Sequence, residues 1–266
     1  MSYVKPEAVV DQMVAAGTYK AGLGTKDLLI RGMLSGGLLG VATTLAITAA
    51  AQTHLPIVGA LIFPVGFVMI VLLGLELVTG SFALLPTALF SRKIGFGRLA
   101  SNWSFVFLGN LIGSLIYAGL FVIVSTKMGH VDTSPVIELI KKIAEGKTLG
   151  YDKLGVADGF IVAFTKAILC NWMVSMGVVM ALTATTTIGK IFAMWLPILT
   201  FFGQGFEHAV VNMFVIPAGI MLGANVDVAQ WWFLNEIPVT LGNIVGGVLF
   251  TGLALYATHY KPSASK

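Results

Sequence analysis

Two short polar clusters interrupt long apolar stretches of this sequence, and their residue types suit the handling of anions and protons. The first cluster contains Glu76 and Thr79, and the second contains Glu207 and His208. An imidazole can hold an anion, lend it a proton, or do both, because its ordinary pKa lies near neutrality. The hydroxyl of Thr79 can donate a hydrogen bond to a small oxyanion, or it can cap the helix that follows.

These clusters lie in a chain with the composition of an integral membrane protein. Of its 266 residues, 57% are hydrophobic and 11% are charged, whereas soluble domains carry about 25% charged residues. A water-soluble globule of this composition would expose large apolar patches. The composition therefore excludes an ordinary cytosolic enzyme, a nucleic-acid-binding protein and a disordered chain.

Apolar stretches long enough to cross a hydrocarbon layer of roughly 30 Å indicate six membrane spans. They lie at residues 29–52, 57–90, 103–126, 157–182, 190–221 and 236–258. The second and fifth are too long for one straight helix and contain the polar clusters, so we predict that both are broken. The chain then divides into an amphipathic N-terminal segment (1–28), a membrane domain (29–258) and a short tail (259–266). The helical spacing within the N-terminal segment involves Val9, Met13, Ala16 and Tyr19.

The distribution of basic residues predicts a cell-membrane protein with both termini in the cytoplasm, because lysines and arginines concentrate in cytoplasmic loops. With six crossings, the opposite loops 53–56 and 222–235 contain no basic residue. Loop 127–156 carries lysines against this trend, and its residues 135–146 are expected to form a surface helix. The basic residues on the side of the termini are Lys5, Lys20, Lys26, Arg31, Arg92, Lys93, Arg98, Lys190, Lys261 and Lys266.

An internal repeat relates the two polar clusters. Gly74, Glu76 and Pro86 recur in the same order as Gly205, Glu207 and Pro217, and Leu-Gly-Asn-x-x-Gly occurs at both Leu108 and Leu241. Three spans in each half make the two copies inverted in the membrane. Inverted repeats that each contain a broken helix are typical of a transport site at the repeat interface.

Broken helices place helix N-termini near the bilayer centre, where we expect them to begin after Ser81 and after His208. Their partial positive charge favours an anion over a cation. For His208 the alternative is a buried side chain bonded to Glu207 or to a backbone carbonyl. We interpret Glu76 and Glu207 chiefly as acceptors for freed backbone N–H groups; a proton relay is the alternative, but fixed negative charges would repel an anion.

Other polar side chains inside the spans are further candidates. Lys166 can draw anions toward a pore from the extracellular side, snorkel to that surface, or pair with a glutamate. Asn171, Asn110 and Asn243 line the path or bridge helices, and bridging is favoured for the last two because each lies in a Gly-x-x-x-Gly step. Apolar residues near the breaks can form constrictions or simply pack: Phe63, Phe67, Leu77 and Phe201.

The sequence contains no recognisable enzyme constellation. It has no paired histidines at metal-ligand spacing, no glycine-rich phosphate loop, and no nucleophile with a base. Its single cysteine, Cys170, is interpreted as a packing residue. We therefore expect no catalysis, no metal and no cofactor.

Four segments resemble the formate/nitrite transporter family over residues 8–258. They are Glu76-Leu-Val-Thr79-Gly, Cys170-Asn171-Trp172-Met-Val174, Gly205-Phe-Glu207-His208-Ala-Val-Val-Asn212-Met-Phe and Ile237-Pro-Val-Thr-Leu-Gly-Asn243. The resemblance implies an all-α, aquaporin-like fold of six helices, assembled as a homopentamer in the lipid bilayer with one pore per subunit. It also implies passage of formate, nitrite, hydrosulfide or other small monovalent anions such as acetate, lactate and bicarbonate.

By the same resemblance, His208 matches the central histidine of the family and Thr79 the threonine of its loop in the second span. Lys166 matches a basic position found in many members. Constriction residues are implied as well: Phe63, Phe67 and Phe201 for the outer one, and Leu77 and Val174 for the inner one, with Asn171 and Asn243 beside it.

The leading hypothesis is a channel or transporter for a small monovalent anion, formate first and nitrite second, in which the weak acid is protonated at His208. Alternatives are transport of bicarbonate, hydrosulfide or a short-chain carboxylate by the same pore, or an aquaporin-type channel for neutral solutes. The paired Asn-Pro-Ala motifs of aquaporins are absent from this sequence. A membrane subunit that binds partners without transporting is a further alternative.

Overall fold

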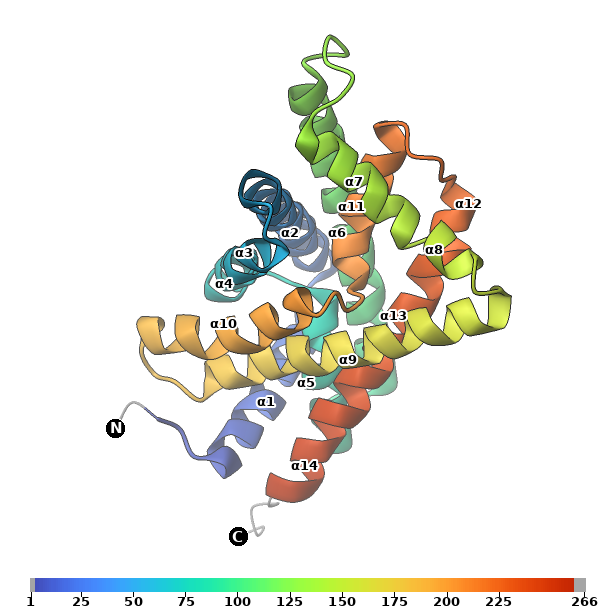
Figure 1. Cartoon of the computed structure of the whole chain (residues 1–266). Coiled ribbons are helices and arrows are strands. Elements are labelled where there is room, and N and C mark those ends of the chain that lie inside the picture. Colours follow the sequence, from blue (N-terminus) through green and yellow to red (C-terminus); the bar gives the residue numbers. More distant parts are fainter. Residues whose placement is uncertain (1–2, 261–266) are drawn as a thin grey trace, which may run out of the picture.

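The computed structural model describes residues 3–260, which fold as a bundle of helices (Figure 1). Within this part of the chain, extended pairing is limited to one isolated bridge between Tyr3 and Ala184. Four helical runs are long and apolar enough to cross a membrane: α2 (Thr25–Thr53), α6 (Phe96–Thr126), α9 (Val156–Leu182) and the continuous run Val228–His259. The fold is therefore all-helical, as the sequence predicts.

The continuous run at the end of the described chain contains two π-helical segments. It consists of α12 (Val228–Trp231), the π-helix η1 (Trp232–Glu236), α13 (Ile237–Gly247), the π-helix η2 (Val248–Leu253) and α14 (Ala254–His259). π-Helical turns inside α-helices are rare and often mark functional sites.

Both apolar segments that carry the polar clusters are interrupted. The first consists of α3 (Pro56–Ile62), α4 (Pro64–Leu72) and α5 (Val78–Phe90), and the second of α10 (Thr187–Gly203) and α11 (Ala209–Met221). The helical conformation is interrupted at Gly74 and Gly205, whose φ values of 62° and 64° lie in the left-handed region. Such angles favour glycine because a side chain is strained there. An additional bend separates α3 from α4, because Pro64 has no N–H to continue the helix.

The two helix starts that follow the breaks differ in how well the sequence locates them. Helix α11 begins at Ala209, directly after His208, as expected. Helix α5 begins at Val78 and not after Ser81, because the N–H groups of Gly80 and Ser81 already donate to the carbonyl of Leu77. Thr79 therefore lies in the first turn of α5 and does not cap it.

Two amphipathic helices cover opposite ends of the bundle (Figure 1). Helix α1 (Pro6–Ala21) packs on α5 through buried residues that include Val9 and Met13. Tyr19 is 60% exposed and lies off the buried face, which continues to Ala21. Helix α7 (Pro135–Gly146) is docked on α11 with Ile137 and Ile140 fully buried, and the short α8 (Leu149–Asp152) follows it.

Small residues allow two helix pairs to approach closely. A side chain added at Gly113 on α6 would overlap the backbone of Met33 on α2, and one added at Gly36 would overlap the backbone of Asn110. The same holds for α13 against α9, where Gly246 lies on the backbone of Ile168. Without a hydrophobic driving force in lipid, such close backbone contact is a main source of helix association.

Gly113→Ala should therefore destabilise the bundle by about 1–3 kcal/mol, because the methyl group forces α2 and α6 apart. Thermal unfolding of the detergent-solubilised protein measures the effect. Gly119→Ala on the same helix is the matched control, since a methyl group there meets nothing within 4 Å. Equal unfolding temperatures for the two variants would contradict the packing argument.

Candidate functional site

The first helix break is held by the side chain of Asn110 on α6. Its Oδ1 accepts a hydrogen bond from the N–H of Val78 at 3.0 Å, while its Nδ2 donates to the carbonyls of Glu76 and Gly32, both at 2.9 Å. One amide thus binds backbone groups on both sides of the break and also bridges to α2. Backbone groups freed inside a membrane need such partners, because lipid offers none.

Asn243 on α13 holds the second break in the same way. Its Oδ1 accepts from the N–H of Ala209 at 2.9 Å, and its Nδ2 donates to the carbonyls of Glu207 (2.9 Å) and Ala167 (2.8 Å). The freed backbone groups are therefore bound by asparagines and not by the glutamates to which we assigned them. An amide suits this position better than a carboxylate, because it carries both a donor and an acceptor.

His208 and Thr79 meet in the interior and join the two breaks. His208 Nε2 lies 3.0 Å from Thr79 Oγ1, and His208 Nδ1 accepts a hydrogen bond from the N–H of Val211 at 3.2 Å. Because Nδ1 is occupied as an acceptor, the neutral ring carries its proton on Nε2 and donates it to Thr79. His208 is 2% exposed, and within residues 3–260 its ring bonds neither Glu207 nor a backbone carbonyl.

Asn171 on α9 connects this pair to the second break. Its Nδ2 donates to the carbonyl of Thr79 at 3.1 Å and to the carbonyl of Asn243 at 2.7 Å. Its Oδ1 has no hydrogen-bond partner among the described residues. Asn171 therefore lies beside the His208–Thr79 pair and ties α5 to α13.

Each buried glutamate forms an ion pair with a lysine from an amphipathic or connecting segment. Lys20 on α1 binds Glu76 at 2.8 Å, and Lys147, directly after α7, binds Glu207 at 2.7 Å. An unpaired carboxylate at this depth would be costly, so these lysines explain how both charges are tolerated.

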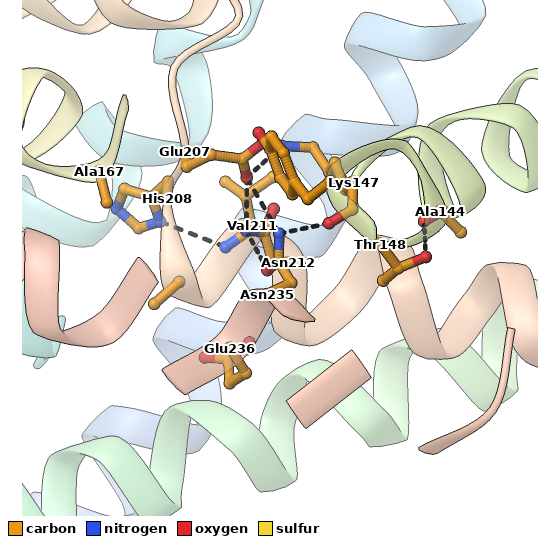
Figure 2. Close-up of polar contacts among 12 residues, drawn as sticks. Ala144, Lys147, Thr148, Ala167, Glu207, His208, Val211, Asn212, Asn235 and Glu236 are labelled. Atoms are coloured by element: carbon orange, nitrogen blue, oxygen red, sulfur yellow. Dashed lines mark hydrogen bonds and ion pairs between the residues drawn. The ribbon is translucent and has the colours of Figure 1, made fainter. Parts of the chain in front are cut away.

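Glu207 has further donors besides Lys147 (Figure 2). Its Oε2 accepts from Asn212 at 2.8 Å and from Asn235 at 3.4 Å, and its Oε1 accepts from the phenol of Tyr151 at 2.6 Å. Burial and the neighbouring Glu207 carboxylate raise the pKa of Tyr151 above its ordinary value, so the phenol remains a donor at physiological pH.

Two cavities lie on opposite sides of the His208–Thr79 pair. The α1-side cavity, of about 310 Å³, is lined by residues that include Lys20, Lys190, Glu76, Phe67 and Leu77. The α7-side cavity, of about 190 Å³, is lined by residues that include Lys147, Phe201, Phe202, Val211 and His208. Thr79 is fully buried between them: it bonds His208 on one side, and its neighbour Gly80 lines the α1-side cavity.

The apolar residues expected at constrictions separate into two groups. Phe63 stacks on Phe202 with ring centroids 3.8 Å apart and meets the edge of Phe201 at 5.7 Å, and Phe201 in turn stacks on His208 at 5.6 Å. Phe67 lines the α1-side cavity together with Leu77, whereas Phe201 lines the α7-side cavity. The structure therefore groups Phe67 with Leu77 and not with Phe201. Val174 is fully buried in the core.

Lys166 lies away from both cavities. Its Nζ is 5.8 Å from the centre of the Tyr151 ring, and among the described residues it forms no ion pair with Glu76 or Glu207. Lys147 instead provides the charge in the α7-side cavity. Sequence reasoning missed Lys147 and placed it among loop lysines; the signal available was the need of Glu207 for a cation.

Glu236 is a third buried carboxyl, and sequence reasoning missed it. It ends the π-helix η1 and is fully buried, where it accepts hydrogen bonds from Trp231 Nε1 at 3.1 Å and from Thr240 Oγ1 at 3.4 Å. Within the described chain no lysine or arginine forms an ion pair with it. Its polar contacts are therefore all with neutral groups.

Together, the all-helical fold and two lysine-bearing cavities separated by a buried histidine define a membrane channel, and comparison with known proteins identifies its kind. A family model for formate/nitrite transporters matches residues 7–257, and the chain belongs to this family. A probable formate transporter of Methanothermobacter thermautotrophicus is 35% identical and aligns over 85% of this chain and 84% of its own length. The formate channel FocA of Escherichia coli is 32% identical over 96% and 94%.

An uncharacterized transporter of Bacillus subtilis, YrhG, is 36% identical over 100% of this chain and 97% of its own. Two solved structures share the fold. An ion channel of the family superposes with a TM-score of 0.81 at 27% identity, covering 94% of this chain and 99% of its own. A pentameric formate channel with formate bound gives a TM-score of 0.73 at 26% identity, covering 89% and 98%. The relatives named here are transporters and channels, not enzymes.

Replacing Lys147 alone should destabilise the protein strongly, because it leaves the Glu207 charge buried and uncompensated. We expect Lys147→Met to cost about 3–5 kcal/mol and the double variant Lys147→Met/Glu207→Gln to recover most of this loss. Unfolding of the detergent-solubilised variants measures both values. A double variant no more stable than the single one would show that the ion pair is not what tolerates Glu207.

Glu236 offers a test of whether its carboxyl acts as a neutral group. Glu236→Gln retains an acceptor for Trp231, so its unfolding free energy should stay within about 1 kcal/mol of wild type. Glu236→Leu leaves the indole N–H without an acceptor and should cost about 1–3 kcal/mol. If the glutamine variant is the less stable of the two, the negative charge of Glu236 matters to the fold.

Proposed function

We propose that the protein is a channel for small monovalent weak-acid anions, with formate the first candidate substrate and nitrite the second. The observation that carries this proposal is the buried His208–Thr79 pair between two cavities that each contain a lysine. Family membership and the names of FocA and of the pentameric formate channel support formate as substrate.

The arrangement admits anions to both cavities but opposes their passage through the centre as charged species. Lys190 faces the α1-side cavity without an ion pair among the described residues, so it raises the local concentration of anions there. Lys20 in the same cavity and Lys147 in the other offset the buried charges of Glu76 and Glu207, which would otherwise repel an anion. Moving a bare carboxylate into an apolar medium costs on the order of 20 kcal/mol in the idealised limit. The neutral acid avoids most of this cost, which favours weak acids over chloride or sulfate.

His208 is the group suited to deliver the proton. In the arrangement observed, Nε2–H is the donor and Nδ1 accepts from Val211. The Nε2–H bond breaks as the proton passes to the bound anion, and a hydronium ion from the α7-side cavity, which His208 lines, gives a proton to Nδ1. The ring thus stays neutral and formic acid leaves. For this exchange the Val211 hydrogen bond opens. Nδ1 then returns its proton to water and Nε2 takes one from hydronium, which restores the first tautomer.

The same proposal includes the membrane arrangement. The chain crosses the membrane six times as two inverted three-helix repeats within residues 29–258, with both termini in the cytoplasm. The equivalent contacts of Asn110 and Asn243 across the two breaks support the repeat. The subunits assemble as a homopentamer, supported by the likeness to a pentameric formate channel.

The central test is formate uptake into proteoliposomes with the internal pH recorded. Wild-type uptake should change the luminal pH, because a proton accompanies each anion. His208→Phe removes the donor and should abolish this uptake. His130→Phe, in an exposed loop, is the matched control and should behave as wild type.

Nitrite, acetate and bicarbonate in the same assay rank the substrates, and osmotic swelling in glycerol tests the neutral-solute alternative. Electrogenic formate flux without a luminal pH change, and unaffected by His208→Phe, would show a simple anion channel and refute the protonation step.

A further inference from the structure

The two repeat-related glutamates differ in how completely their oxygens are satisfied. Glu207 receives hydrogen bonds from four donors, which occupy both of its carboxylate oxygens. Such a carboxylate is strongly stabilised in its ionised form, since hydrogen bonds to a charged group favour the charge. Glu207 therefore has no oxygen left for a permeating molecule.

Glu76 has a single donor. Lys20 Nζ binds its Oε1 at 2.8 Å, while its Oε2 is buried and has no hydrogen-bond partner among the described residues. A buried acceptor left unpaired is costly, so the group that pairs with it has to be identified. The two repeat-related glutamates thus differ in that Oε2 of Glu76 is unpaired within the described chain, whereas both oxygens of Glu207 accept hydrogen bonds.

The α1-side cavity is where a ligand can supply the missing donor. Glu76 lines this cavity of about 310 Å³, which exceeds the size of any one-carbon acid. Rotation about the terminal torsion of a glutamate is broad and roughly two-fold, so either oxygen can turn toward the cavity while the other keeps Lys20.

The charged and titratable groups around Glu76 come from three helices. Lys20 and Tyr19 lie on α1, Lys190 lies on α10, and Arg31 on α2 binds the carbonyl of Gly74 at 3.4 Å. The lysines favour a negatively charged ligand, whereas the Glu76 carboxylate repels one. An undissociated acid satisfies both, because its O–H can donate to Glu76 while its C=O accepts from a lysine.

We propose that Glu76 is the binding site for the undissociated acid in the α1-side cavity and accepts its proton. This inference rests on the proposed function and specifies the form of the substrate at one end of the pathway. The acid O–H bond breaks, the proton binds Glu76 Oε2, and the carboxylate anion remains beside Lys20 and Lys190. Water then takes the proton from Glu76 and restores its charge; entry from this side follows the reverse sequence.

The test is the exchange of labelled formate by proteoliposomes at equal pH on both sides, over a range from acidic to neutral. Glu76→Gln removes the proton acceptor, and we expect its apparent affinity for formate at acidic pH to fall about tenfold or more. We also expect the wild-type dependence of exchange on pH to flatten.

Lys20→Gln is the matched control, because it breaks the same ion pair but leaves the carboxylate in place. It should keep a clear dependence of exchange on pH, and Glu76→Asp should restore one. A merely structural role for the pair predicts instead that Glu76→Gln and Lys20→Gln lose activity equally at every pH. That result would overturn the proposal, as would an unchanged pH profile in Glu76→Gln.

Infrared difference spectra provide a second measurement if Glu76→Gln does not fold. Loading the wild-type protein with formate at acidic pH should produce a protonated-carboxyl band that shifts in Glu76→Asp; a band that does not shift refutes the assignment. The proposed function fails separately, if wild-type proteoliposomes do not exchange formate at all.

Discussion

Backbone groups cannot remain unpaired inside a bilayer, and the rest of this structure depends on how that requirement is met at the two helix breaks. Asn110 and Asn243 each bind a carbonyl and an N–H on either side of a break, and each also anchors that break to a neighbouring helix. The close glycine contacts between helices bring these amides within reach.

The site follows from these anchored breaks. They place the first turns of α5 and α11 against each other, so that Thr79 and His208 meet in the interior. They also bring Glu76 and Glu207 to positions where lysines from outside the helix core can reach them. The lysines consequently face the two cavities, which lie on either side of the buried His208–Thr79 pair. A charged species is disfavoured at that buried pair.

Much of this arrangement can be predicted from the sequence, because the strongest signals are local or repeated. Apolar length identifies the membrane helices, and glycine next to polar residues locates the breaks. The start of α5 was misplaced because Leu77 adopts an extended conformation without a capping side chain. Partners such as Lys147 for Glu207 join residues far apart in the chain, and no local pattern encodes them. Glu236 was missed for a different reason. Its donor Trp231 is only five residues away, but the contact depends on the π-helical turn Trp232–Glu236 between them, which no sequence pattern indicates.

The contacts at each break stay within one half of the chain, and this has a consequence for biosynthesis in the membrane. Asn110, Lys20 and Glu76 all precede the middle of the sequence, whereas Asn243, Lys147 and Glu207 all follow it. Each half can thus satisfy its own break soon after it leaves the translocation machinery. The hydrogen bonds to Thr79 from His208 and Asn171 join the halves, so the pathway closes only at the last stage of insertion. A nascent chain that ends after α9 would have its first helix break paired by Asn110. It would still lack His208, and therefore the His208–Thr79 pair between the two cavities.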